Sequence, residues 1–348
     1  IDTTTFQISS DIRQIALMII LMRAGLNLQI SDLKKVGSSA LLMCFVPASF
    51  EIIGLMILAP IFLHLDLLNA ALLGTVLAAV SPAVVVPLML KLMDEGYGTK
   101  EGIPQLIMAG ASMDDVYVIV LFTSLLTLAK SGEFNALSLL RIPTSILFGI
   151  ISGIVLGYVL CKLYRLLKLS TEIELASMFA IGMVLITIER MMAGVVGFSG
   201  LLAIMAMTAA MRHINPEMAD KYSAILAKLW QPAEIFLFAL VGASVRIDYA
   251  LSFGPVVLVV IILALLFRML GVYLSIMQTK FNRKERIFTM IAYIPKATVQ
   301  AAIGGLALEA GLASGELILT TAVTAILVTA PLGAIFISFT YRNFLQKA

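Results

Sequence analysis

The stretch "GTVLAAVSPAVVVPLML", residues 74–90, has the length and apolar character of a membrane-spanning helix, yet it carries Pro82 and Pro87 in its middle. A proline inside a helix removes one backbone hydrogen bond and its ring clashes with the preceding turn. Non-helical backbone is tolerated at membrane depth only where it is buried in protein or lines a cavity. The stretch therefore predicts a helix that is broken inside the membrane, near these two prolines.

A second stretch has the same design. "IAYIPKATVQAAIGG", residues 291–305, places Pro295 directly before Lys296, with Thr298 two residues further on. One proline-containing span is consistent with a simple kink. Two spans of this kind, both rich in small residues, predict two discontinuous helices that line a site, with partly charged half-helix ends at each break.

The composition of the whole chain is that of a polytopic membrane protein. Of its 348 residues 61% are hydrophobic and 13% charged, and the mean hydropathy is +1.04. Soluble domains have roughly 45–50% apolar and 25% charged residues. The net charge of +3 does not indicate a nucleic-acid partner, because the basic residues lie in short loops between apolar segments. The lipid bilayer is therefore the expected partner.

A span of the ~30 Å hydrocarbon core needs about 20 mostly apolar residues. Eleven segments qualify: 7–29, 36–63, 67–92, 103–129, 140–164, 172–190, 194–212, 224–244, 250–278, 286–308 and 316–340. With this count, most of the 24 lysine and arginine residues fall in loops on one side. Cytoplasmic loops are enriched in these residues, so we expect residue 1 outside and the C-terminus in the cytoplasm.

Five ionisable residues fall deep in predicted spans, where a charge costs roughly 2.5–3.5 kcal/mol. They are Glu51, Asp114, Asp115, Arg268 and Lys296. Three acids against two bases leave one negative charge unmatched, which a proton or a monovalent cation would balance. The alternative is that the five form ion pairs that only fix helix packing, and for Glu51 and Arg268 that alternative stays open.

Glu234 lies nearer the end of its predicted span than these five residues do. It could face the site or lie at the membrane surface. A separate pattern, "GIISGIVLG", places Gly149, Gly153 and Gly157 four residues apart. Small residues at this spacing let two helices approach closely. We expect tight packing within the protein, with a dimer face as the alternative.

The two halves of the chain show a weak internal correspondence. Pro82 and Lys296 occupy matching positions in the two broken spans, and the same offset carries Glu51 close to Arg268. Matching spans lie an odd number of helices apart, so the two copies enter the membrane from opposite sides. This is the pattern of an inverted-topology repeat, which in transporters places the site at the midplane between the halves.

Together these motifs resemble those of the NHA type of sodium/proton antiporter, within the cation:proton antiporter superfamily. The similarity extends over nearly the whole chain, and the segments that carry it are "LMRAGLNL" (21–28), "AAVSPAVVVPLML" (78–90), "GYGTKEGIPQLIMAGASMDD" (96–115) and "YIPKATVQAAIG" (293–304).

The resemblance implies an all-α inverted-repeat antiporter fold, in which a core domain with two crossing, partly unwound helices stands beside a scaffold domain that dimerises. We expect the core at approximately 36–129 and 250–340, and the scaffold at approximately 7–29 and 140–244. Family members usually have more than eleven spans, so we expect N-terminal spans to be missing from this sequence. A homodimer in a bacterial inner or plasma membrane is the expected form.

The resemblance also implies roles for the site residues. Asp115 corresponds to the essential carboxylate for cation and proton, and Asp114 is its neighbour in the paired-acid motif. Ser81 and Thr298 mark the unwound stretches that flank the site, and Lys296 lies at the helix crossing.

At the position of Arg268, some bacterial relatives have a lysine that pairs with an aspartate, so this sequence differs from their pattern. Glu51 is available here as the partner of Arg268, and this departure bears on the transport stoichiometry.

The predicted function is exchange of Na⁺ or Li⁺ for H⁺ by alternating access, with the two competing for Asp115. Neighbouring helix positions point about 100° apart, so Asp114 is free to engage Lys296 or a backbone end instead. Ser112, Ser81 and freed backbone carbonyls are candidates to complete an oxygen shell around the cation. No cofactor is expected beyond the transported ions.

We considered three other classes. An intramembrane aspartyl protease needs two aspartates that share a proton, and adjacent residues on one helix diverge too far for that. A sodium-coupled transporter of organic anions is the main alternative, although no anion pocket is evident. A cation channel would not need a buried lysine and arginine. The chain is therefore expected not to be an enzyme.

Overall fold

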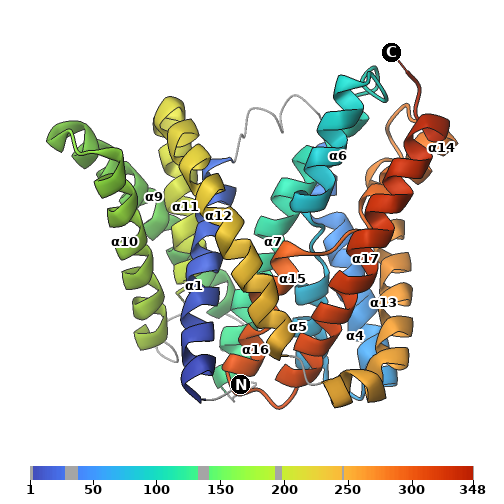
Figure 1. The fold of residues 1–348 in the computed structure, drawn as a ribbon, viewed down its shortest axis with the longest axis horizontal. Coiled ribbons are helices and arrows are strands. Elements are labelled where there is room, and N and C mark those ends of the chain that lie inside the picture. Colours follow the sequence, from blue (N-terminus) through green and yellow to red (C-terminus); the bar gives the residue numbers. More distant parts are fainter. Residues whose placement is uncertain (1–2, 28–37, 132–140, 193–197, 245–246, 348) are drawn as a thin grey trace. The chain divides into compact units, whose positions relative to one another are not determined.

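The computed structural model describes residues 3–27, 38–131, 141–192, 198–244 and 247–347. Within these ranges the regular structure is helical (Figure 1), apart from one isolated bridge between Tyr97 and Lys347. The chain divides into two compact units, each made of two stretches of sequence. The first unit comprises Ile1–Gln29 and Val120–Leu240, and the second comprises Ile30–Ile119 and Val241–Ala348.

The first unit contains α1 (Thr3–Leu26), α9 (Arg141–Leu167), α10 (Thr171–Met192), α11 (Gly200–Ile214) and most of α12 (Pro216–Ser244). Helix α11 packs against α1, α9 and α10. A Cβ atom on Gly153 would lie 2.4 Å from the backbone oxygen of Ala203, and one on Gly157 would lie 2.4 Å from that of Met207. The glycine stripe thus packs tightly within this unit, and its alternative use as a dimer face is wrong because α11 occupies it.

The second unit contains the remaining helices: α3 (Ser38–Met43), α4 (Val46–Leu63), α5 (Leu67–Leu77), α6 (Pro82–Asp94), most of α7 (Ile103–Ser131), α13 (Ile247–Ser275), α14 (Arg283–Ala292), α15 (Thr298–Ile303), α16 (Leu306–Glu309) and α17 (Gly315–Phe344). Helix α4 packs on α5 and α13, and α17 packs on α6, α13, α14, α15 and α16. Gly54 of α4 brings this helix against the ring of Phe267 in α13.

Six segments of the described chain are long and apolar enough to cross a membrane: Ser38–Leu63, Leu67–Asp94, Leu147–Leu167, Thr171–Glu189, Gly254–Ser275 and Gly315–Phe344. Three shorter apolar helices, Gln14–Leu26, Tyr117–Lys130 and Gly200–Ile214, accompany them. The count of eleven spans therefore stays a prediction. The ends of predicted spans at 28–29, 36–37, 140 and 194–197 lie outside the described residues.

The helix boundaries correct the sequence-based prediction at several points. Pro87 does not break a helix: it lies inside α6, which begins at Pro82, because losing one backbone bond does not unwind a helix that is otherwise continuous. The predicted span 36–63 is two helices, α3 and α4, with a turn at Cys44 and Phe45. The predicted span 286–308 is divided among α14, α15 and α16.

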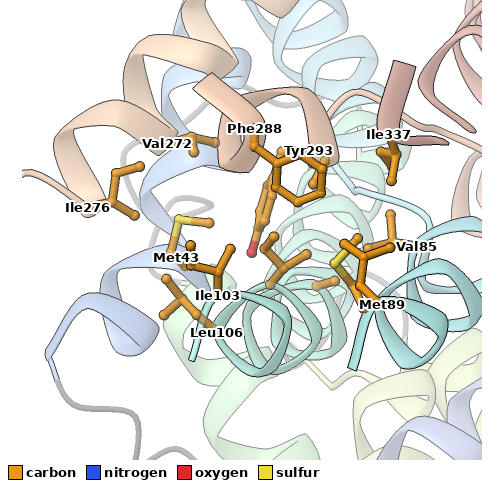
Figure 2. Close-up of a cluster of buried hydrophobic side chains, with 14 of the residues drawn as sticks. Met43, Val85, Met89, Ile103, Leu106, Val272, Ile276, Phe288, Tyr293 and Ile337 are labelled. Carbon is orange, nitrogen blue, oxygen red and sulfur yellow. The ribbon is translucent and has the colours of Figure 1, made fainter. Parts of the chain in front are cut away.

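A buried apolar cluster in the second unit joins α3, α6, α7, α13, α14 and α17 (Figure 2). Phe288 and Met43 lie in this cluster, and so does the ring of Tyr293, just after the end of α14. The cluster therefore fixes the chain immediately before the break that Pro295 introduces.

Candidate functional site

The first break separates α5 from α6. Helix α5 ends at Leu77 and α6 begins at Pro82, with Ser81 in an extended conformation (φ −87°, ψ 108°). A residue before proline is disfavoured in the helical conformation, and proline itself is favoured as a first helical residue. The carbonyl groups at the end of α5 consequently lack helical partners and must find other donors in this buried place.

The second break separates α14 from α15. Helix α14 ends at Ala292 and α15 begins at Thr298, so the intervening residues, which include Pro295, leave the helical path. The backbone N–H of Ser81 donates to the carbonyl of Pro295 at 2.8 Å. The two breaks that the sequence predicted are thus both present, and they are in direct contact.

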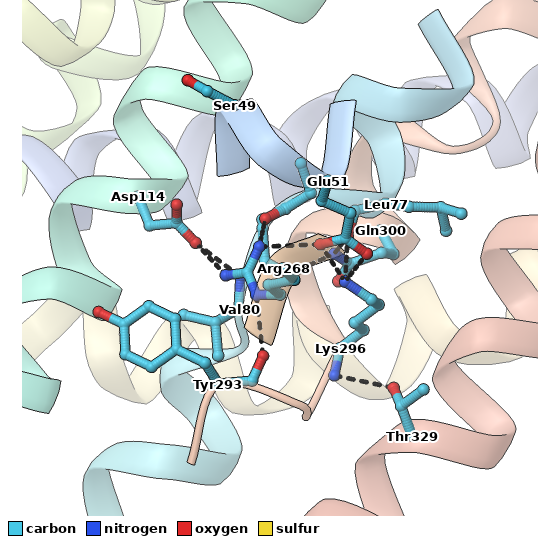
Figure 3. Close-up of polar contacts among 12 residues, drawn as sticks. Ser49, Glu51, Leu77, Val80, Asp114, Arg268, Tyr293, Lys296, Gln300 and Thr329 are labelled. Carbon is cyan, nitrogen blue, oxygen red and sulfur yellow. Dashed lines mark hydrogen bonds and ion pairs between the residues drawn. The ribbon is translucent and has the colours of Figure 1, made fainter. Parts of the chain in front are cut away.

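Arg268 of α13 binds both breaks and two acids (Figure 3). Its guanidinium donates to Glu51 Oε2 at 2.9 Å and to Asp114 Oδ2 at 2.6 Å. It also donates through Nε to the carbonyl of Tyr293 at 2.8 Å and through Nη1 to the carbonyl of Ala78. Only 1% of the Arg268 side chain is exposed, so its charge depends on these protein groups rather than on water.

Lys296 forms the second centre of the network. Its Nζ lies 2.7 Å from Glu51 Oε1 and 2.9 Å from Glu51 Oε2, and it donates to the carbonyl of Leu77. The amide of Gln300 donates to the carbonyl of Ala79 at 2.8 Å. Lysine, arginine and glutamine side chains therefore cap the C-terminal end of α5, where the helix dipole places partial negative charge.

The adjacent aspartates have different surroundings. Asp114 Oδ2 accepts from Arg268 and also from the backbone N–H of Val80 at 3.0 Å. Asp115 is 9% exposed, and no described residue hydrogen-bonds its Oδ1. Both arginine and lysine are already paired with Glu51 and Asp114, so Asp115 is the acid to which no base is assigned.

Other buried oxygens near the breaks lack partners among the described groups. They include Ser81 Oγ, Asp114 Oδ1, Gln300 Oε1 and the hydroxyl of Tyr293. Buried polar groups are nearly always hydrogen-bonded, so such oxygens indicate water or an ion. Among the described residues, no group of three or more His, Cys, Asp or Glu side chains is placed to hold a metal ion.

The structure brings together most of the predicted site residues, with two changes of partner. Asp114 pairs with Arg268 rather than with Lys296, because Lys296 is held by Glu51 and the end of α5. Freed backbone carbonyls were predicted as possible cation ligands, and at the first break the carbonyls of residues 77–79 accept hydrogen bonds from side chains instead.

Two predicted residues are not described fully. The backbone of Ser112 lies in α7 and that of Glu234 in α12, but both side chains lie outside the described residues. Thr298 is buried as the first residue of α15.

Gln300 and Thr329 were missed. The backbone N–H of Lys296 donates to Thr329 Oγ1 at 3.0 Å, and both side chains are buried. A polar residue inside an apolar span was the signal that could have found them.

The fold has known counterparts. The sodium proton antiporter MjNhaP1 from Methanocaldococcus jannaschii, solved at pH 8, superposes with a TM-score of 0.81 over 95% of this chain and 85% of that chain, at 19% identity. The fold is therefore that of a polytopic, all-helical antiporter structure.

The sequence identifies the family. The family model described as "Sodium/hydrogen exchanger, transmembrane" matches residues 4–342, and the chain belongs to this family of multi-pass membrane proteins. Human sodium/hydrogen exchanger 9B2 is 36% identical over 353 residues, and human sodium/hydrogen exchanger 9B1 is 35% identical over 340 residues. These alignments cover 97% and 94% of this chain, respectively, but 65% of each relative. The chain thus spans less than two thirds of their length.

Proposed function

We propose that the protein exchanges Na⁺ or Li⁺ for H⁺ across a membrane, with both ions competing for Asp115. The observation that carries this proposal is the division of charge in the second unit. Arg268 and Lys296 are used by Glu51 and Asp114, whereas Asp115 is buried without a described partner for Oδ1. Counted as ionised, these five groups sum to one negative charge, which one proton or one monovalent cation balances.

The exchange follows from that balance. A buried carboxylate without a base is strongly disfavoured as a bare anion, so it holds either a proton or a cation. Ser81 Oγ and Asp114 Oδ1 offer further oxygens, the ligand type that hard cations prefer. Water and the hydroxyl of Ser112 are candidates to complete the shell. The site then changes its side of access only when its charge is neutralised.

We also propose the domain roles and topology. The second unit is the core, in which α5–α6 and α14–α15 are two crossing half-helix pairs, and the first unit is the scaffold that forms a homodimer. The full protein has eleven or more spans with a cytoplasmic C-terminus. A similar spacing supports an inverted repeat. Asp114 accepts a hydrogen bond from the N–H of Val80, 34 residues earlier, and Thr329 accepts one from the N–H of Lys296, 33 residues earlier.

The alternative of a sodium-coupled organic-anion transporter finds no support in the family match or in the named relatives. A bacterial membrane stays a prediction, and the relatives named above are human proteins.

Proton movement in sealed vesicles tests the function. The full-length protein is reconstituted, and Na⁺, Li⁺ or K⁺ is added outside while the internal pH is recorded. Wild-type protein is expected to move protons on addition of Na⁺ or Li⁺. Replacing Asp115 by Asn removes the titrating carboxylate and is expected to abolish this movement while the protein stays folded.

The matched control is Asp66→Asn. Asp66 is an exposed carboxylate that caps α5 by accepting from the N–H groups of Leu68 and Asn69, and Asn caps helices equally well. This variant is expected to exchange ions like the wild type. A wild-type protein that moves no protons with any of these cations refutes the function, whereas an active Asp115→Asn protein refutes only the site.

A further inference from the structure

The buried hydroxyl of Tyr293 has no role in the exchange mechanism proposed above. Tyr293 follows the last residue of α14, and 1% of it is exposed. Its ring lies in the apolar cluster beside Phe288 and Met43, and Figure 2 shows its oxygen in the middle of these side chains. No described group hydrogen-bonds this oxygen. Burying a hydroxyl without a partner is unfavourable, so its retention needs a reason.

Gly110 shows that the structure makes room for this hydroxyl. A Cβ atom on Gly110 would lie 2.0 Å from the Tyr293 hydroxyl oxygen, closer than two such atoms can approach. The same Cβ would lie 3.3 Å from Tyr293 Cζ, a tight distance that a small shift accommodates. Met43 Cβ would lie 2.9 Å from the same Cβ, so the Tyr293 hydroxyl is the closer of two groups that require a glycine here. Gly110 is one helical turn before Asp114 on α7, so the hydroxyl meets α7 next to the paired aspartates.

Arg268 holds Tyr293 in this orientation. Its Nε donates to the Tyr293 carbonyl at 2.8 Å, and its guanidinium carbon lies 5.3 Å from the centre of the tyrosine ring. Figure 3 shows the hydroxyl of Tyr293 and the carboxylate of Asp114 on the same side of this guanidinium. The residue that neutralises Asp114 thus also orients the tyrosine.

The unpartnered groups here are chemically complementary. Ionised carboxylates only accept hydrogen bonds, and Asp114 Oδ1 and Asp115 Oδ1 both lack a described donor. A tyrosine hydroxyl is a donor as well as an acceptor. A buried water typically needs two to four polar partners, and these three unpartnered oxygens on neighbouring elements are of the type that it needs.

We propose that Tyr293 is a positioning residue of the ion site, whose hydroxyl holds a water against the paired aspartates and so favours cation binding. This inference rests on the proposed exchange function. It assigns to Tyr293 a role in ion affinity rather than in folding. Tyr293 acts on the cation through this water and is not itself a ligand of the cation.

The test is Tyr293→Phe, measured as proton movement in vesicles over a range of Na⁺ or Li⁺ concentrations. Losing one hydrogen bond to the site is expected to raise the apparent KM for the cation about fivefold, with the maximum rate changed less than about twofold. Thermal unfolding is expected at the wild-type temperature or above it, because the variant removes a buried hydroxyl that has no protein partner. Tyr158→Phe, a control at an exposed position on α9, is expected to leave both quantities unchanged.

The outcomes separate the two proposals. Wild-type protein without exchange refutes the proposed function. Active wild-type protein with an unchanged KM in Tyr293→Phe refutes the role of the hydroxyl. A clearly lower unfolding temperature in Tyr293→Phe also refutes it, since the hydroxyl would then have a structural partner.

A second measurement tests the placement without relying on transport. Gly110→Ala is expected to lower the unfolding temperature because its methyl group meets the Tyr293 hydroxyl. Combining it with Tyr293→Phe is expected to restore part of that loss. A double variant no more stable than Gly110→Ala alone overturns the assigned contact.

Discussion

The two helix breaks of the second unit meet each other, yet their exposed backbone groups are satisfied in different ways. At the first break, the carbonyls of residues 77–79 accept from Lys296, Arg268 and Gln300. Two of these donors are charged, and both are paired with Glu51. The first break is therefore held by two positive charges, which Glu51 and Asp114 balance.

The second break depends mainly on neutral donors and acceptors. Thr329 Oγ1 accepts from the N–H of Lys296, and the N–H of Ser81 donates to the carbonyl of Pro295. Only the Tyr293 carbonyl receives a charged donor, Arg268. The difference teaches that the buried bases are needed to hold the first break, so they are not free to neutralise Asp115.

The largest expected effect is that of Arg268→Gln. It removes the one side chain that binds both breaks and two acids, and it leaves Asp114 and Glu51 with less compensation. Breaking a buried ion pair by removing one partner costs about 3–5 kcal/mol. The variant is expected to unfold at a much lower temperature than the wild type, as measured by thermal unfolding in detergent, and to lose exchange.

Two further variants sharpen this expectation. Arg268→Lys keeps the charge but not the planar fork that reaches several acceptors, so an intermediate stability is expected. Arg342→Gln, at an exposed position near the end of α17, is the matched control and is expected to unfold like the wild type. An Arg268→Gln protein of wild-type stability would show that the first break does not depend on charge.

A smaller effect is expected for Gln300→Leu. This change keeps the volume of the side chain but removes the donor to the carbonyl of Ala79, while Lys296 still serves Leu77. Leaving a buried carbonyl without a partner costs about 2 kcal/mol, so the unfolding temperature should fall by less than in Arg268→Gln. Gln278→Leu, at an exposed position, serves as the control. Equal stability of the two leucine variants would contradict the role assigned to Gln300.

The same contrast shows what the sequence was able to predict. The positions of the breaks were predictable, because Pro82 and Pro295 act through their own backbone. The gathering of Glu51, Arg268 and Lys296 was predictable as well, because a buried charge in a membrane needs a partner. Tight packing at Gly153 followed from spacing alone and is confirmed by its contact with Ala203.

The pairing within the network was not predictable, since it depends on how distant helices meet. The sequence allowed Asp114 to engage Lys296, and only the fold shows that Arg268 takes this place. Pro87 was misread because a proline inside a helix removes only one backbone hydrogen bond and does not by itself break the helix. Freed backbone carbonyls were expected to serve the cation, whereas those of residues 77–79 accept from donors, among them Gln300, that lie far away in the sequence.

The smallest expected effect concerns the second break and the hydroxyl of Thr329. Thr329→Val keeps the shape of the side chain but leaves the N–H of Lys296 without its acceptor, at a cost of about 1 kcal/mol. The unfolding temperature should fall slightly, and Thr329→Ser should restore it because the acceptor returns. Thr340→Val, whose hydroxyl only bonds the Phe336 carbonyl of its own helix at an exposed position, is the control. If Thr329→Ser unfolds at the same temperature as Thr329→Val, packing rather than the hydroxyl fixes the second break. The two breaks would then differ further, since the first is held by side-chain hydrogen bonds.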